Sequence, residues 1–346
     1  MSKRLFAAYL TWRRLLLVAA FVSAAGVHVA AFAQPSDPLV VRREVNGWLN
    51  RIHDAALNEN YEGTFVFQRG GMIQSSRIVH VAPRHGDEYE RLESLDGQPR
   101  TMLRDNDNIF TFIPERKLCI VDHRQSKITF PALVGADSSS VLDVYDPRLL
   151  GVERVAGYDS QVIELDPKDH FRFGYKLWAD KSTGLLLRAQ TLDPNGHVLE
   201  QIAFSQIEIG TDNDHNSIAV AIHNLAGWHV IHDSTTAVNM SAQGWTINPG
   251  VAGFREIRQL RRPMIVHGPG SAPVEVDQAV FSDGLSAISV FVEPGGKGTR
   301  HEGTGSSGAT HILVRRMGNF WITLLGEVPL DTLQEFASAI KYKDPK

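Results

Sequence analysis

The feature that most constrains the fold of this chain is a long series of short, strand-like runs separated by turn residues. The first two runs, 63–68 and 72–81, flank an Arg69-Gly70-Gly71 turn and predict a β-hairpin. Further runs lie at 89–95, 100–104, 109–113, 118–122, 128–130, 161–166, 175–179, 185–191 and 198–209. Turn dipeptides separate most of them, so we expect one antiparallel sheet, curved or partly closed.

We expect helices in three places. Residues 38–60 carry apolar side chains along one helix face, with Asp37 as the cap and Pro38 in the first turn. We also expect a helical segment within 138–150. The chain closes with a helix from about 330 to 340, whose apolar positions follow the same spacing.

The composition changes at a polar stretch that begins at Gly210, and we take 210–226 as a linker. The first folded domain would then cover 34–209 and the second 227–346. Strand-like runs in the second domain lie at 253–260, 279–281, 286–293, 311–316 and 320–325. The final helix follows these runs and closes the second domain.

The first 33 residues have the features of a secretory signal peptide. Four basic residues precede an apolar run that ends in Ala31-Phe32-Ala33, a small-x-small site that predicts cleavage after Ala33. The alternative is an uncleaved anchor helix, but Gly26 and His28 interrupt the apolar run. We therefore expect an exported protein.

Cysteine content and charge narrow the class further. Cys119 is the single cysteine, so no internal disulfide can form, and a bacterial periplasm fits better than eukaryotic secretion. Its apolar neighbours predict a buried core position. The net charge of −4 becomes about −8 without the leader, which argues against nucleic acid as a partner.

The sequence contains little evidence for a catalytic, metal or cofactor site. Residues 295–299 (Gly-Gly-Lys-Gly-Thr) lack the spacing and the following helix of a phosphate loop. His229 and His232, near Asp233, would point to opposite faces of a strand. Acidic pairs such as Asp87-Glu88 and Glu90-Glu93 are expected to be solvated, not catalytic. We predict no catalytic residue, no metal site and no cofactor.

Apolar residues recur on strands of the first domain. One interpretation is an ordinary packed core, and the other is a sheet curved around a lipid-binding cavity. The candidate lipid-pocket residues are Phe65, Phe67, Ile73, Ile78, Phe110, Phe112 and Phe130.

Four arginines lie close together in the second domain: Arg255, Arg258, Arg261 and Arg262. A solvated face is the simplest interpretation. The alternative is a binding patch for an acidic partner segment, because arginine is favoured at interfaces.

Several motifs resemble those of the MucB/RseB family of periplasmic sigma-E factor regulators. They are Tyr61-Glu-Gly-Thr-Phe-Val-Phe-Gln-Arg-Gly-Gly71, Ser76-Arg-Ile-Val-His80, the stretch 88–100, Tyr175-Lys-Leu-Trp-Ala-Asp180, Thr183-Gly-Leu-Leu-Leu-Arg188 and the stretch 281–293. The resemblance runs over essentially the whole chain after the leader, in the same order.

The resemblance implies an α+β fold with two parts. The N-terminal domain should be a half-open antiparallel β-barrel with covering helices, similar to lipoprotein carriers, and the C-terminal domain a smaller α+β domain that binds the partner. The implied role is negative regulation of an envelope-stress sigma factor in the periplasm. The protein would bind the periplasmic domain of an inner-membrane anti-sigma factor and shield it from proteolysis, and a lipid or lipopolysaccharide would release it.

Two other classes of function stay open at this point. A periplasmic lipid or lipoprotein carrier would explain the apolar sheet, although a bare carrier has no need of the second domain. An enzyme, such as a hydrolase, would need a nucleophile with a base in one cleft. A homodimer is also kept as a possible assembly.

Overall fold

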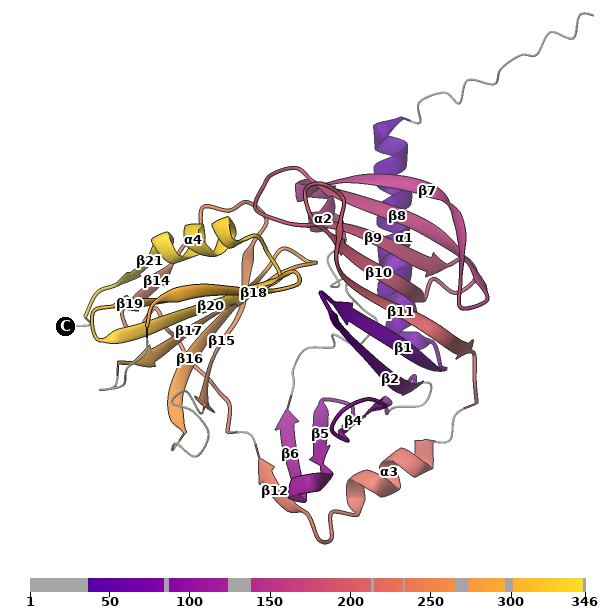
Figure 1. Cartoon of the computed structure of the whole chain (residues 1–346), viewed down its shortest axis with the longest axis horizontal. Coiled ribbons are helices and arrows are strands. Elements are labelled where there is room, and N and C mark those ends of the chain that lie inside the picture. Colours follow the sequence, from indigo (N-terminus) through magenta and orange to yellow (C-terminus); the bar gives the residue numbers. More distant parts are fainter. Residues whose placement is uncertain are drawn as a thin grey trace, which may run out of the picture. The chain divides into compact units, whose positions relative to one another are not determined.

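The computed structural model describes residues 37–83, 87–123, 138–212, 215–232, 234–264, 273–295 and 301–344. The described residues form two large sheets, a two-stranded ribbon and four α-helices (Figure 1). The predicted signal peptide with its cleavage at Ala33, the run 128–130 and most of the glycine-rich loop at 295–299 lie outside these ranges.

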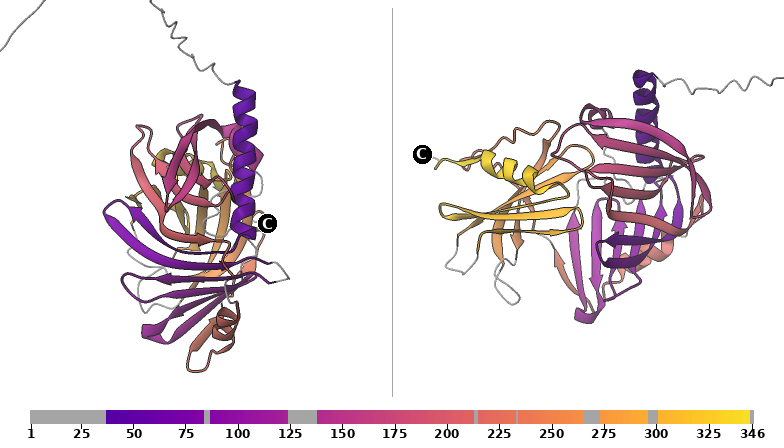
Figure 2. Two further views of the ribbon diagram at one scale, coloured as in Figure 1. Left: turned by 90° about the vertical axis from the view of Figure 1, so that its right-hand side faces the viewer. Right: turned by 45° about the horizontal axis from the view of Figure 1, so that its top comes forward.

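The first sheet has twelve strands in the order β12-β6-β5-β4-β3-β2-β1-β11-β10-β9-β8-β7. The two end strands do not pair with each other, so the sheet is open, and Figure 2 shows its strands twisted and curved. The strands are β1 Tyr61–Arg69, β2 Met72–Val81, β3 Tyr89–Ser94, β4 Thr101–Asp105, β5 Asn108–Ile113, β6 Leu118–His123, β7 Tyr145–Val155, β8 Tyr158–Pro167, β9 Gly174–Asp180, β10 Leu186–Leu192, β11 Val198–Ile209 and β12 His229–His232. A short 3₁₀ turn, Pro114–Arg116, joins β5 to β6.

Neighbouring strands of this sheet pair antiparallel, as expected, including the β1–β2 hairpin. The one parallel pair is β12 with β6, which the sequence did not predict. The fold class of an open, mainly antiparallel sheet with covering helices is therefore confirmed.

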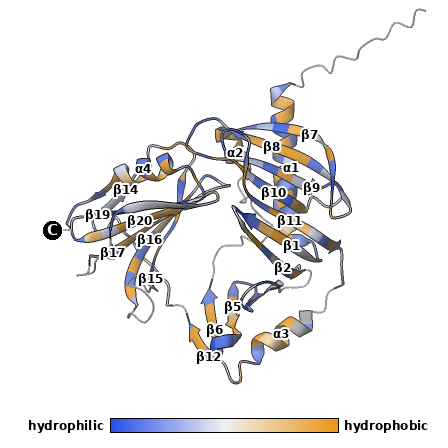
Figure 3. Ribbon diagram, viewed as in Figure 1, coloured by the Kyte–Doolittle hydropathy of each residue, from blue (hydrophilic) through white to orange (hydrophobic). Residues whose placement is uncertain are grey.

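Helix α1 (Pro38–Asn58) begins where the sequence predicts it and ends at Asn58. The Asp37 carboxylate accepts a hydrogen bond from the Leu39 N–H at 2.9 Å, which caps the first turn. One face of the helix is buried, through Val45, Leu49, Ile52, Ala55 and Ala56. It packs near β7, β10 and α2. Figure 3 shows hydrophobic and hydrophilic residues alternating along it.

The helical segment expected within 138–150 is only partly right. Helix α2 covers Ser138–Val144, but the residues from Tyr145 onward form strand β7. Pro147 explains the difference, because a proline lacks the N–H that a continuing helix needs. The segment pairs instead with β8 from Tyr145 to Val155.

Helix α3 (His215–His223) lies within the stretch predicted as a linker. It packs, through Ile218 and Ile222, on a cluster that includes Leu103, Phe112 and Cys119. Cys119 is fully buried, as predicted, and burial raises the pKa of its thiol. Strand β12 follows α3, so the first sheet draws on residues as far as His232.

The second sheet has seven strands in the order β13-β15-β16-β17-β20-β19-β18. They are β13 Thr236–Ala237, β15 Arg255–Met264, β16 Val274–Ser282, β17 Ala287–Pro294, β18 Gly303–Ser307, β19 Thr310–Met317 and β20 Phe320–Gly326. Strands β14 (Trp245–Ile247) and β21 (Ile340–Tyr342) form a separate ribbon. Helix α4 (Leu330–Ala339) confirms the predicted final helix.

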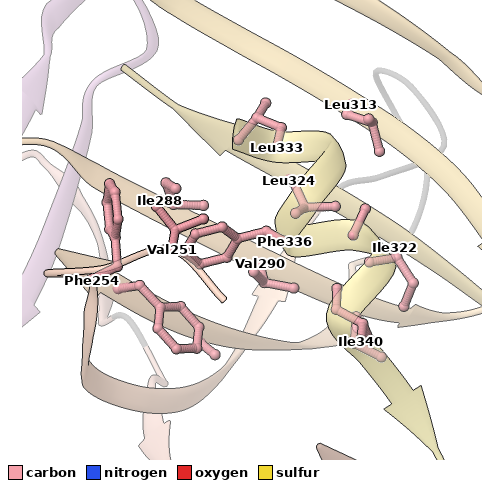
Figure 4. Close-up of a cluster of buried hydrophobic side chains, with 14 of the residues drawn as sticks. Val251, Phe254, Ile288, Val290, Leu313, Ile322, Leu324, Leu333, Phe336 and Ile340 are labelled. Carbon is pink, nitrogen blue, oxygen red and sulfur yellow. The ribbon is translucent and has the colours of Figure 1, made fainter. Parts of the chain in front are cut away.

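The core of the second domain lies between α4 and one face of its sheet. Leu333 and Phe336 of the helix are fully buried against sheet residues such as Val290 and Leu324 (Figure 4). Phe254 and Phe281 both meet the Phe336 ring edge-on, with centroids 5.4 Å away. These contacts account for the smaller α+β domain that the resemblance implies.

Candidate partner-binding surface

The residues proposed to line a lipid cavity fall into different environments. Phe65 and Ile78 are buried in one packed cluster, where the Phe65 ring meets Phe204 edge-on at 6.0 Å. Phe112 is buried in a different cluster, the one on which α3 packs, and Phe110 is partly buried against that cluster. The remaining described members of the set are half-buried Phe67 and Ile73, which is 62% exposed. Phe130 lies outside the described residues. Lipid binding by this set stays a prediction.

The four predicted partner-binding arginines all lie on β15, but they do not share one face. Paired residues in an antiparallel sheet point to the same side. Arg261 pairs with Asp277, on the face that packs against α4. Arg258 and Arg262 pair with Val280 and Val276, which point to the opposite face.

A β-bulge decides where Arg255 points. The register shifts between Glu256 and Arg258, which places one extra residue in β15. Arg255 and Arg258 therefore lie on the same face, although they are three positions apart, a spacing that puts residues of a regular strand on opposite faces. The structure brings Arg255, Arg258 and Arg262 to the face away from α4 and leaves Arg261 on the other.

Arg261 is held by its own strand neighbour. Its guanidinium donates to Asp277 through Nε to Oδ1 at 2.6 Å and through Nη2 to Oδ2 at 3.0 Å. This bidentate bond raises the pKa of Arg261 further above its usual range. The Gln243 amide completes the group, because its nitrogen faces Asp277 Oδ2 and its oxygen faces Arg261 Nη2 in the orientation that satisfies both.

A row of polar side chains is buried in the first sheet, contrary to the expectation that these acids are solvated. Across β1–β4 the register aligns Tyr61, His80, Glu90 and Arg104. Glu88 lies beside them and accepts a hydrogen bond from Arg104 Nη1 at 2.8 Å. Glu88 is 8% and Glu90 3% exposed. The paired cation Arg104 explains how these acids are accommodated inside the sheet.

The two acids respond to this environment in opposite ways. Burial disfavours the charge on Glu88, but hydrogen bonds from His80 and Arg104 outweigh it and lower the pKa of the carboxyl. For Glu90 burial dominates, and its pKa is raised although Arg104 and His80 partly oppose the shift. Glu90 Oε2 has no hydrogen-bond partner among the described residues. No spacing in the sequence signals this row, because strand register creates it.

A second buried polar group joins the two sheets. Arg172, in the β8–β9 connection, donates from Nη1 to Asp283 Oδ2 at 2.9 Å, and Asp283 lies in the β16–β17 turn. Arg172 also donates to both Asp169 oxygens at 3.0 Å and to the Ala252 carbonyl at 2.6 Å. The Tyr145 hydroxyl donates to Asp283 at 3.2 Å. Each charged nitrogen of Arg172 therefore has a partner.

Neighbouring contacts extend this junction. The Tyr175 hydroxyl and the Ser286 Oγ lie 2.8 Å apart, and burial raises the pKa of Tyr175. The Thr332 hydroxyl of α4 donates to the Phe171 carbonyl at 2.6 Å. Both bonds join the first sheet's segments to the second domain, so the junction is built from directional contacts.

The turn between β18 and β19 makes a separate contact with the first sheet. The Ala309 N–H donates to Glu200 Oε1 at 2.9 Å, and Glu200 also pairs with Arg69 at 2.7 Å. Gly308 lies against these two side chains with a left-handed backbone, φ +57°. Any other residue would place its Cβ only 2.6 Å from Arg69 Cγ. The glycine permits this close approach.

The described residues offer neither a metal site nor a membrane-spanning helix. Within them, no group of three or more His, Cys, Asp or Glu residues is arranged to hold a metal ion. Strand β12 includes His229 and His232, both exposed. None of the helices in the described part of the chain combines the length and hydrophobicity that a membrane span requires.

Two family models match this chain, the MucB/RseB N-terminal domain over residues 44–222 and the MucB/RseB C-terminal domain over residues 239–341. The Sigma factor AlgU regulatory protein MucB of Pseudomonas aeruginosa is 28% identical over 311 residues, which cover 88% of this chain and 93% of the relative. The Sigma-E factor regulatory protein RseB of Escherichia coli K12 is 25% identical, covering 85% of this chain and 89% of the relative.

Solved structures agree with these matches. The complex structure of Pseudomonas aeruginosa MucA/MucB superposes with a TM-score of 0.67 at 26% identity, covering 87% of this chain and 99% of that one. The crystal structure of MucB in complex with MucA(peri) gives 0.65 at 27% identity, covering 86% of this chain and 98% of that one. The similarity includes both sheets, and the chain belongs to the MucB/RseB family.

Proposed function

We propose that this protein is a periplasmic negative regulator of an envelope-stress sigma factor. It binds the periplasmic part of a membrane-spanning anti-sigma factor and shields that part from proteolysis. One observation carries the proposal: the similarity extends over both domains to a MucB whose solved structure is a complex with MucA(peri). The relatives are named as regulatory proteins of a sigma factor.

The junction between the sheets supports this role. A binder gains affinity when its own parts are already ordered, because less freedom is lost on binding. Arg172 with Asp283 and Glu200 with Ala309 tie the two sheets together before any partner arrives. We infer that a partner segment meets a largely preformed surface.

Regulation then follows from linkage. The regulator stabilises the anti-sigma segment in the bound, protected form. A lipid or lipopolysaccharide that binds the free regulator more tightly than the complex must weaken the complex by the same factor. A stress signal of that kind releases the anti-sigma factor to its protease.

Capture from envelope extract tests the proposal and separates it from the carrier alternative. The tagged full-length chain is expressed in its own host, and captured proteins are identified by mass spectrometry. We expect an inner-membrane protein with one span and a cytoplasmic sigma-binding part. Capture of outer-membrane lipoproteins in its place would contradict the proposal and favour a carrier.

A further inference from the structure

A cavity of about 260 Å³ lies at one end of the second sheet, on the face that carries α4. Its walls come from the sheet and from the β14–β21 ribbon, through residues such as Trp245, Phe320 and Tyr342. A cavity of about 150 Å³ can hold a benzene ring, whereas pockets for drug-sized ligands begin at about 300 Å³. The cavity therefore suits a ligand the size of one long side chain.

Three aromatic rings form one wall of this cavity. Trp245 and Phe320 have centroids 4.9 Å apart, Phe320 and Tyr342 also 4.9 Å, and Trp245 and Tyr342 4.6 Å. Trp245 is 3% exposed, whereas Phe320 and Tyr342 are half-buried. Aromatic rings offer apolar surface to the stem of a long side chain and can attract a cation that lies over a ring face.

Two carboxylates and one guanidinium also line the cavity. Asp277 is already satisfied by Arg261 and by the Gln243 amide. Glu275, two residues earlier on β16 and on the same face, is exposed and forms no salt bridge within the described residues, although it lies near enough to Arg261 to help raise the pKa of that guanidinium. The lining thus carries one negative charge in excess, held by a carboxylate that can accept a new donor.

Nearby lysines do not cancel this charge from inside the cavity. Lys341 alternates with Ile340 and Tyr342 on β21, so its side chain points to the other face of the ribbon. Neither Lys341 nor Lys343 lines the cavity.

We propose that this cavity binds the cationic end of one lysine or arginine side chain from the anti-sigma segment. The proposal rests on the function proposed above and names the chemistry that one of its contacts uses. The apolar stem of the side chain packs against Phe320 and Tyr342, and the charged end meets Glu275. The cavity thereby fixes the register of the bound segment.

Affinity measurements on four variants test this assignment. Titration calorimetry is carried out with residues 34–346 and the periplasmic segment of the anti-sigma factor. Glu275→Gln removes the free carboxylate, and we expect about fivefold weaker binding. Tyr342→Leu removes one ring and should weaken binding by a similar factor, whereas Tyr342→Phe should bind like the original. Glu335→Gln, the same charge change on an exposed residue of α4 outside the cavity, should have no effect.

A scan of the partner identifies the occupant. Each Lys and Arg of the segment is changed to Gln, and one position should weaken binding to the unchanged protein about fivefold but cause no further loss with Glu275→Gln. If Glu275→Gln binds normally, or no basic position couples to it, the assignment is wrong. A loss with Tyr342→Leu alone would mean an apolar occupant and would also overturn it. Failure of the unchanged protein to bind would overturn the proposed function, and this inference with it.

Discussion

Arg172 and Asp283 form a salt bridge of 2.9 Å in which neither side chain is exposed to solvent. The two residues are 111 positions apart in the chain and belong to loops of different sheets. A buried pair of this kind adds little over apolar packing, but removing one partner leaves the other charge buried without compensation. The junction between the sheets is therefore sensitive to single substitutions.

Replacing Arg172 by Met should lower the free energy of unfolding by about 3–5 kcal/mol, because Asp283 stays buried and loses its cation. Urea denaturation followed by circular dichroism measures the change. Arg77→Met is the control: Arg77 pairs with Glu62 while 53% exposed, and its loss should cost less than about 1 kcal/mol. Equal costs for the two variants would mean that the junction is not a buried ion pair.

Gly308 and Gly318 offer a matched pair in the second domain. Both have left-handed backbone, with φ of +57° and +58°. A Cβ on Gly308 would lie 2.6 Å from Glu200 Oε1, whereas one on Gly318 would meet nothing within 4 Å. Gly308→Ala should therefore destabilise by at least about 1 kcal/mol more than Gly318→Ala, as read from thermal melts. Similar melting temperatures for both variants would mean that the close contact of Gly308 with the first sheet does not contribute to stability.

Glu90 and Glu88 should affect the pH dependence of stability with opposite signs. The pKa of Glu90 is raised, so its stabilising proton is present below the ordinary carboxyl pKa and is lost as the pH rises through the higher folded value. At pH 7 the buried charge of Glu90 therefore lowers the free energy of unfolding. Glu90→Gln should raise the free energy of unfolding by about 1 kcal/mol at pH 7 and lose this advantage toward pH 4.

Glu88→Gln should do the reverse. The pKa of Glu88 is lowered, so its contribution is present above the ordinary carboxyl pKa and is lost as the pH falls through the lower folded value. Removing the charge that accepts from Arg104 should cost about 2 kcal/mol at pH 7 and less in acid. Denaturation curves at pH 7 and pH 4 measure both variants. The same sign for both at pH 7 would refute the assignment of the two environments.

Arg258 tests the arginine-rich face in partner binding. Arg258 is exposed on the side of β15 away from α4, and Arg258→Glu should weaken binding of the anti-sigma segment roughly tenfold. Arg261 is unsuitable for this test because its charge is held by Asp277. Lys343→Glu is the control for charge reversal. Fluorescence anisotropy at two salt concentrations measures the binding of both variants. Equal losses would mean that the face is merely solvated.

The parts of the fold that the sequence predicts are those set by local signals. Asp37 and Pro38 mark the start of α1, and the Gly70-Gly71 turn marks the β1–β2 hairpin. Each signal acts within a few residues, where capping and turn chemistry decide the backbone. Pro147 is also such a signal, because its missing N–H limits how far the helix expected within 138–150 can extend.

The rest of the fold depends on pairings between distant segments. The β12–β6 pair joins residues more than a hundred positions apart. The buried acid Glu90 is placed beside His80 and Arg104 only by strand register. Arg255 shares a face with Arg258 only because of a bulge. None of these relationships has a local signature. The sequence therefore shows which candidate residues are present, but not which of them share a surface.

Direct binding tests the central claim, that this protein holds the periplasmic segment of an anti-sigma factor. Residues 34–346 are titrated with that segment in a calorimeter, with a scrambled segment of equal composition as the control. A saturable complex with a Kd of about 1 µM or tighter, absent with the scrambled segment, is the predicted result. No measurable heat with either segment at tens of micromolar, about tenfold above that Kd, would contradict the account.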